Sequence, residues 1–173
     1  GTTIGQSYIN HEVVQEFKEG QRKLMKGDCP GVRENKERIV QLMLVPLIQS
    51  TLRYAYLQYT TDSGEKEEAQ GATFAAAVLP YLQSCSADDA KVRYQNMKVG
   101  HEIKTDFPAV KKSFENHYQC LGITCSDVGG VWDPVTRKYM EDATPCNSSG
   151  GSATNSLGLG VGIAAGGAVF LAI

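Results

Sequence analysis

Apolar residues recur along most of this 173-residue chain at the three- and four-residue spacing of amphipathic helices, and alternating strand-like runs are scarce. The first helical segment covers residues 8–26, and its apolar stripe consists of Ile9, Val13, Val14, Phe17 and Leu24. Gly27 and the Cys29-Pro30-Gly31 sequence predict a turn after it. The sequence therefore predicts a first amphipathic helix that ends before residue 29.

Two longer helical segments follow, each with a proline inside. Residues 33–59 are the most apolar part of the predicted core, and Pro46 should kink that helix or make it restart, because proline lacks a backbone donor. The next segment, residues 64–84, begins with acidic residues, which the helix dipole favours at this end. Pro80 predicts a kink near its end.

Two shorter helices complete the pattern. Ser86 is a good N-cap for a helix that ends before Gly100, and Thr105 or Asp106 caps another that runs to Gly122. Residues 123–146 contain turn signals and predict a loop. We therefore expect an all-α domain over residues 1–146, a bundle of about five helices with a disulfide-tied C-terminal loop.

The composition changes after Asp142, the last charged residue. Residues 147–156 are small and polar, and residues 157–173 are apolar and rich in glycine and alanine, with a length at the lower limit of ~17–25 for a membrane-spanning helix. This order resembles a glycosyl-phosphatidylinositol (GPI) anchor signal. We expect membrane attachment through this tail, as a lipid-anchor signal or a retained hydrophobic anchor; a flexible tail is the alternative.

Charge and motif content narrow the functional classes. The chain has 17 basic and 19 acidic residues, and this near balance argues against a general nucleic-acid binder. The sequence contains no GxSxG elbow, P-loop, GxGxxG or HExxH motif. We therefore expect that the protein is not an enzyme; a surface reductase or hydrolase is the enzymatic alternative.

Five cysteines predict a secreted protein with disulfides, because none lies in a CxxC motif and zinc-finger spacing is missing. Cys29 precedes the four disulfide candidates, Cys85, Cys120, Cys125 and Cys146. The sequence leaves the connectivity open; our working pairs are Cys125 with Cys146 and Cys85 with Cys120. Asn147-Ser148-Ser149 is a glycosylation sequon and also favours the secretory route.

A tyrosine cluster is the most informative candidate for a binding site. Arg53, Tyr56 and Tyr59 share one helix face, while Tyr54 points elsewhere. Phenolate and carboxylate oxygens suit a hard trivalent cation, and a neighbouring arginine can hold a small anion. From the residues alone, packing of the tyrosine rings in the core is the favoured interpretation.

Several long strings resemble one family: VPLIQSTLRYAYLQY, GATFAAAVLPYLQSCSADDAKVRYQNMKVG, FPAVKKSFENHYQCLGITCSDVGGVWD and the final PC at 145–146. They are similar to the algal iron-assimilation family, low-iron-inducible periplasmic proteins that include the diatom phytotransferrins. The resemblance spans residues 8–146. It implies a protein of the extracellular face of the plasma membrane, or of the periplasmic space, that binds ferric iron for uptake with carbonate as synergistic anion.

Family chains usually hold more than one copy of this unit, so the resemblance implies that this chain, which starts at Gly1, is the last unit of a longer protein with an upstream repeat. Guided by the resemblance, we select as metal ligands Tyr54, Tyr56, Glu67 and Glu68, with Arg53 as anion partner. Gln70 replaces the acid of the family pattern, and its amide oxygen is a weaker ligand. The alternative function is a surface interaction module that binds no metal.

Overall fold

The computed structural model describes residues 7–61, 64–100 and 104–146, so the expected spacer (147–156), the expected anchor (157–173) and Asn147 lie outside the described residues. The described ranges contain six helices and two short strands. In chain order they are α1 (Tyr8–Met25), α2 (Cys29–Thr60), α3 (Glu65–Cys85), α4 (Ala87–Met97), α5 (Phe107–Glu115), α6 (Cys125–Val128), β1 (Trp132–Asp133) and β2 (Lys138–Tyr139). The all-α prediction is confirmed.

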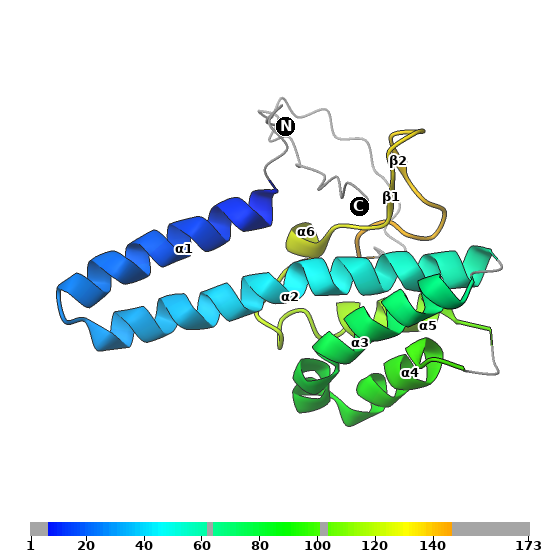
Figure 1. The fold of residues 1–173 in the computed structure, drawn as a ribbon, viewed down its shortest axis with the longest axis horizontal. Coiled ribbons are helices and arrows are strands. Elements are labelled where there is room, and N and C mark those ends of the chain that lie inside the picture. Colours follow the sequence, from blue (N-terminus) through cyan, green and yellow to red (C-terminus); the bar gives the residue numbers. More distant parts are fainter. Residues whose placement is uncertain (1–6, 62–63, 101–103, 147–173) are drawn as a thin grey trace, which may run out of the picture.

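The longest helix, α2, organises the fold. It runs the length of the molecule, with α1 beside its first half and α3, α4 and α5 gathered around its second half (Figure 1). Its second half buries Val45, Ile48 and Ala55 along one stripe, and it also buries Thr51, which points about 120° away from Val45. Because residues on several sides of this half are buried, the helix can be held only by elements that surround it.

The predicted boundaries of α2 are wrong at its start. The Cys29-Pro30-Gly31 sequence is its first turn and not a separating turn, because the Asp28 side chain caps it and accepts a 3.0 Å hydrogen bond from the Gly31 amide. Pro30 is tolerated there because the first amides of a helix have no intrahelical partner. The helix also continues through Pro46, so it does not restart at that residue (Figure 1).

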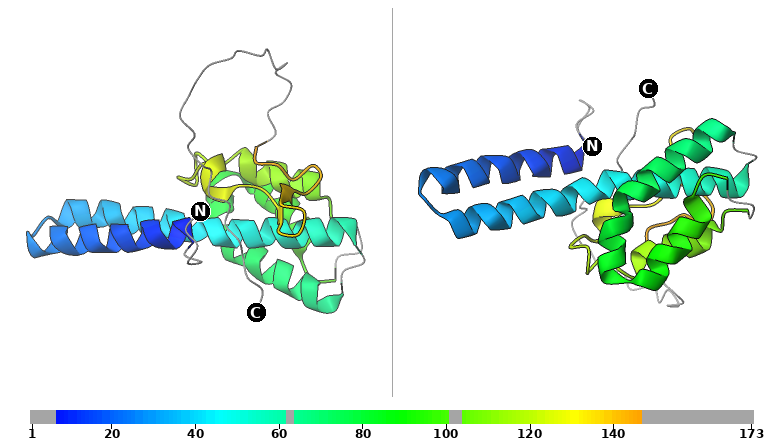
Figure 2. Two further views of the ribbon diagram at one scale, coloured as in Figure 1. Left: turned by 90° about the horizontal axis from the view of Figure 1, so that it is seen from above. Right: turned by 60° about the horizontal axis from the view of Figure 1, so that its bottom comes forward.

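Gly71 marks the place where α3 packs closely against side chains of α2 and α4. Gly71 faces the crossing, and a Cβ there would lie 2.8 Å from the Gln58 amide nitrogen, 2.9 Å from Met97 Cε and 3.0 Å from Tyr54 Cβ. Only glycine leaves room for this approach. The N-terminal half of α3 is thereby held against the C-terminal half of α2, and α4 returns along the other side of α3 (Figure 2).

The C-terminal region has more structure than the predicted loop. Helix α5 ends at Glu115 and not near Gly122, and turns carry the chain from residue 116 to residue 123. Thr124 and Asp127 then form a reciprocal capping box that starts the short α6. Strands β1 and β2 pair as a small antiparallel hairpin, with Trp132 opposite Tyr139. Local capping and a single strand pair leave too little periodicity to be read from the sequence.

Two disulfides hold this region to the helices. Cys85 at the end of α3 bonds to Cys120, and Cys125 at the start of α6 bonds to Cys146. The structure thus contains both working pairs, and Cys29 is exposed with a free thiol. The first bond joins the turns after α5 to the end of α3, and the second joins the start of α6 to Cys146.

Helix α1 packs differently from the prediction. It forms a hairpin with α2 that projects from the bundle (Figures 1 and 2). Of the predicted apolar stripe only Ile9 is buried, and Phe17 and Leu24 are each 61% exposed. Helical periodicity identified the stripe correctly, but it did not reveal how little of the stripe α2 covers.

The core also contains a charged side chain, Arg93 of α4, which is completely buried. Its guanidinium carbon lies 3.2 Å from the centre of the Phe114 ring, and Nη2 donates to Ser113 Oγ over 3.3 Å. Its Nε and Nη1 have no hydrogen-bond partner among the described residues. Burial lowers the pKa of Arg93 to about 9, with the fields of Tyr118 and Asp89 opposing the shift, so the group is still protonated at pH 7.

We expect the double variant Cys85→Ser/Cys120→Ser to lose about 3–4 kcal/mol of unfolding free energy, because the bond closes a loop with a sequence separation of 35 residues. Urea denaturation under non-reducing conditions measures this loss. The matched control is Cys29→Ser, which removes an exposed thiol and should change stability by less than about 0.5 kcal/mol. Equal effects of the two changes would contradict the structural role of the disulfide.

We expect Arg93→Met to raise the unfolding free energy at pH 7 by about 1 kcal/mol, because an apolar side chain of similar length avoids burying a charge. The unfolded chain binds the Arg93 proton up to its ordinary, higher pKa, whereas the folded chain releases it above about 9. Wild-type stability should therefore rise relative to the variant above about pH 9. Urea denaturation of both proteins at neutral and alkaline pH tests this, and a pH-independent difference would count against it.

Candidate functional site

The candidate ligands Tyr54 and Tyr56 lie on different sides of α2, because two residues along a helix correspond to a rotation of about 200°. The ring of Tyr54 stacks on Phe74 of α3 with a centroid distance of 5.8 Å. The ring of Tyr56 meets Phe107 of α5 edge-on at 5.1 Å. The structure therefore divides the candidate ligands between two places.

On the α3 side, the Tyr54 hydroxyl donates a 3.0 Å hydrogen bond to Oε1 of Gln70. The residue that departs from the family pattern is thus the partner of a candidate ligand. Gln58 donates from its amide to the backbone carbonyl of Glu67 over 3.5 Å, which holds the first turns of α3 to α2. This side offers one phenol and one neutral amide oxygen in contact with each other.

The candidate acids Glu67 and Glu68 are half-buried in the first turn of α3. The Glu67 carboxylate turns back toward the start of its own helix, where a Cβ on Gly64 would lie 3.2 Å from Oε2. In that position the negative charge of the carboxylate interacts favourably with the positive end of the helix dipole. The helix start accounts for the acidic first turn without a metal.

On the other side of α2, Tyr56 and Tyr59 share a face, as their spacing predicted, and both rings pack on Phe107. The phenol oxygen of Tyr56 has a hydrogen bond with the backbone of Glu141. Burial first, and then the negative charges of Glu141 and Asp142, raise the pKa of Tyr56 above its ordinary value of 10.0. Tertiary structure thus brings a phenol and two carboxylates of the C-terminal segment into one electrostatic environment.

Glu141 and Asp142 were missed as candidates from the sequence. They lie 85 and 86 positions beyond Tyr56, in the segment predicted as a loop, and both are exposed. Asp142 adopts a positive φ of 56°, which is uncommon for a residue other than glycine. Nothing local in the sequence links these residues to α2; the position of the disulfide-tied segment does so.

The remaining members of the tyrosine cluster are more exposed. Arg53 is exposed one turn before Tyr56, and Tyr59 lies at the surface with the Lys104 ammonium 5.6 Å from its ring centre. A lysine at that distance disfavours a second cation. Tyr59 is therefore a poorer metal ligand than Tyr56.

Two searches of the described residues give negative results. Over residues 7–61, 64–100 and 104–146, no three His, Cys, Asp or Glu side chains gather as a metal-binding group. None of the helices in the same part of the chain has the length and hydropathy to span a membrane.

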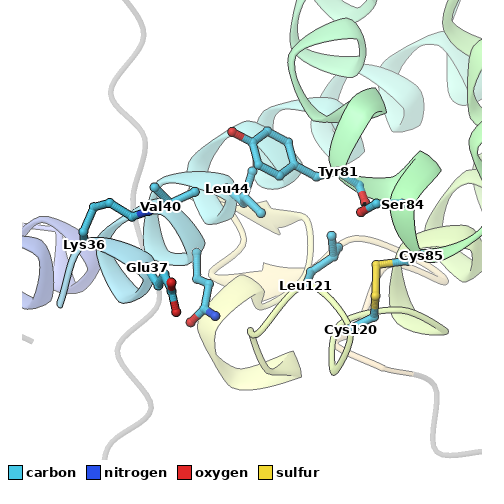
Figure 3. A pocket seen from close by; sticks show the side chains of 10 residues that line it. Lys36, Glu37, Val40, Leu44, Tyr81, Ser84, Cys85, Cys120 and Leu121 are labelled. Carbon is cyan, nitrogen blue, oxygen red and sulfur yellow. Dashed lines mark hydrogen bonds between the residues drawn. A yellow bond between two sulfur atoms is a disulfide. The ribbon is translucent and has the colours of Figure 1, made fainter. Parts of the chain in front are cut away.

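A pocket of about 340 Å³ lies where α2 leaves the bundle (Figure 3). Val40 and Leu44 of α2, Tyr81 of α3 and Leu121 provide its apolar surface, and the Cys85–Cys120 disulfide forms one wall. The pocket contains a single carboxylate, that of Glu37. It is remote from the tyrosine cluster and has no set of anionic oxygens for a hard cation.

Comparisons with known proteins identify no relative: no family model matches the chain, and neither the curated proteins nor the solved structures contain a significant match.

Proposed function

We propose that this protein binds ferric iron as cargo, with Tyr56 as its phenolate ligand and Glu141 and Asp142 as its carboxylate ligands. The observation that supports the proposal is the position of the Tyr56 phenol, which is hydrogen-bonded to the backbone of Glu141 and lies in the field of the Glu141 and Asp142 carboxylates. A hard trivalent cation prefers anionic oxygen ligands. It would also relieve the repulsion that the three oxygens experience when the phenol ionises.

This ligand set shares only Tyr56 with the one expected from the sequence. Tyr56 is retained, with Arg53 one helical turn before it as the partner for a carbonate anion. Tyr54 is engaged by Gln70, and Glu67 faces its own helix start, so neither is included in the proposed site. Carbonate at Arg53 would supply further oxygen donors to a site with few protein ligands.

We place this activity at the outer surface of the cell. Two disulfides within residues 85–146 favour an oxidising compartment. The apolar sequence of residues 157–173 suits attachment to a membrane, and the resemblance to the algal iron-assimilation family agrees with both points. The biological role would be capture of ferric iron for uptake.

Addition of ferric iron and carbonate to the protein should produce a visible phenolate-to-iron absorbance band. Tyr56→Phe removes the phenol oxygen but retains the ring that packs on Phe107, so it should abolish the band without unfolding the protein. The matched control is Tyr54→Phe, which removes the same atom on the other side of α2 and should retain the band. Spectrophotometric titration and calorimetry measure both.

Glu141→Gln and Asp142→Asn should each weaken iron binding by at least about tenfold, because each replaces an anionic ligand by a neutral one. A band that survives Tyr56→Phe and disappears in Tyr54→Phe would place the iron at the Gln70 side of α2. Absence of both the band and any heat of binding in the wild-type chain would falsify the proposed function.

Iron binding by Tyr56 should weaken as the pH falls. The phenol is protonated throughout the range below its raised pKa, so binding must displace one proton from it. The dissociation constant should therefore increase about tenfold for each pH unit lost, and more steeply where carbonate or a carboxylate is also protonated. Titrations from about pH 8 to about pH 5 measure the slope, and a flat profile would contradict phenolate ligation.

A further inference from the structure

The projecting α1–α2 hairpin holds polar residues between its helices. The Asn35 side chain donates a 2.6 Å hydrogen bond to Glu16, and Gly20 lies against Asn35 with 3.4 Å from its would-be Cβ. Nearer the tip, Lys23 donates to the carbonyl of Gly31 over 3.3 Å. In this part of the hairpin, few of the apolar side chains therefore lie between the two helices.

The apolar side chains follow the inner residues by one position in each helix. On α1 the inner positions 13, 16, 20 and 23 are followed by Val14, Phe17, Gln21 and Leu24. On α2 the positions 31, 35, 38 and 42 are followed by Val32, Lys36, Ile39 and Met43. One position corresponds to a rotation of about 100°, and in two antiparallel helices this rotation turns both sets toward the same side of the hairpin.

We call this side, formed by those eight residues, the apolar side of the hairpin. Phe17 and Leu24 are 61% exposed and Met43 is 57% exposed, so other elements leave it largely uncovered. Lys36 is its only charged residue. An exposed apolar surface of this extent is typical of an interaction site.

The opposite side of the hairpin is charged. Its residues precede the inner ones by one position and are Glu12, Gln15, Glu19 and Arg22 on α1, with Pro30, Glu34, Glu37 and Gln41 on α2. Glu19 and Arg22 form an ion pair there. The contrast between the two sides identifies the apolar one as the side that a partner covers, because the charged one is already suited to water.

We propose that the partner is a second copy of this chain, so that two hairpins pair through their apolar sides into a four-helix bundle. A two-fold axis parallel to the hairpin would place α1 of one copy over α2 of the other. The contacts between Asn35 and the residues Glu16 and Gly20 set the levels within each hairpin.

Within about one helical turn of those levels, one register brings the apolar residues of the two copies opposite one another across the two-fold axis. Val14 lies over Met43, Phe17 over Ile39, and Leu24 over Val32. The polar residues Gln21 and Lys36 meet in the same layer, and a single polar layer is a known means of aligning paired helices. The side is therefore complementary to itself, which a two-fold interface requires.

The available area fits a stable dimer. An 18-residue helix is about 27 Å long, and two neighbouring helices are about 18 Å wide, so the hairpin presents roughly 500 Å² in projection. The accessible surface of such a ridged face is larger than its projection, and a standard interface buries about 800 Å² on each partner. The hairpin would thus supply most of the area of a standard interface.

Sedimentation of the 173-residue chain over a range of concentrations tests the proposal, and a reversible monomer–dimer equilibrium is expected. Phe17→Glu should raise the dimer dissociation constant at least about a hundredfold, because it places a charge in both symmetric halves of the interface. Gln15→Glu introduces the same charge on the opposite side of the same helix and should change the constant less than about twofold. Circular dichroism verifies that both variants remain helical.

A mixing experiment tests the pairing of α1 with α2. Phe17→Glu and Ile39→Lys should each weaken self-association, but an equal mixture of the two should restore dimers, because one Glu–Lys pair and one unchanged Phe17–Ile39 contact then form. A wild-type chain that stays monomeric at its solubility limit would overturn the proposal. So would a dimer that Phe17→Glu leaves intact, or a mixture that associates no better than its components.

Discussion

The burial of the second half of α2 is the constraint on which the rest of the structure depends. Val45 and Thr51 are both completely buried although they point about 120° apart around the helix, so this half must be enclosed on more than one side. Helices α3 and α5 pack on it, and α6 is held to it by the 2.8 Å hydrogen bond from Gln49 to the carbonyl of Val128. This enclosure determines the neighbours of every candidate ligand on α2, because each side of the helix contacts a different element.

Polar groups inside the bundle set the alignment of these elements. Thr105 donates to Oε1 of Gln58 over 2.9 Å and to the carbonyl of Asn96 over 3.1 Å, while Asn96 accepts from the amide of Asp106 over 2.7 Å. These bonds join α2, α4 and the start of α5. A shift of any of these helices by one turn would leave buried polar atoms without partners, which costs more than a displaced apolar contact.

The bundle and the α1–α2 hairpin differ in how they bury their apolar residues. The bundle encloses α2 and is covalently tied by the Cys85–Cys120 and Cys125–Cys146 bonds. The inner face of the hairpin consists of small and polar residues such as Gly20, whereas Phe17 is exposed. The proposed iron site belongs to the bundle and the proposed self-association to the hairpin, so the two functions can be altered independently.

The sequence by itself determined the helical class, the approximate extent of α1 to α4 and the separation of Tyr54 from Tyr56, because these follow from a local period of 3.6 residues. It could not place Glu141 beside Tyr56. That contact depends on how the C-terminal segment folds back onto α2. Turns, helix α6 and a disulfide together determine this path. It also could not show that Phe17 is exposed, because periodicity identifies an apolar face but not what covers it.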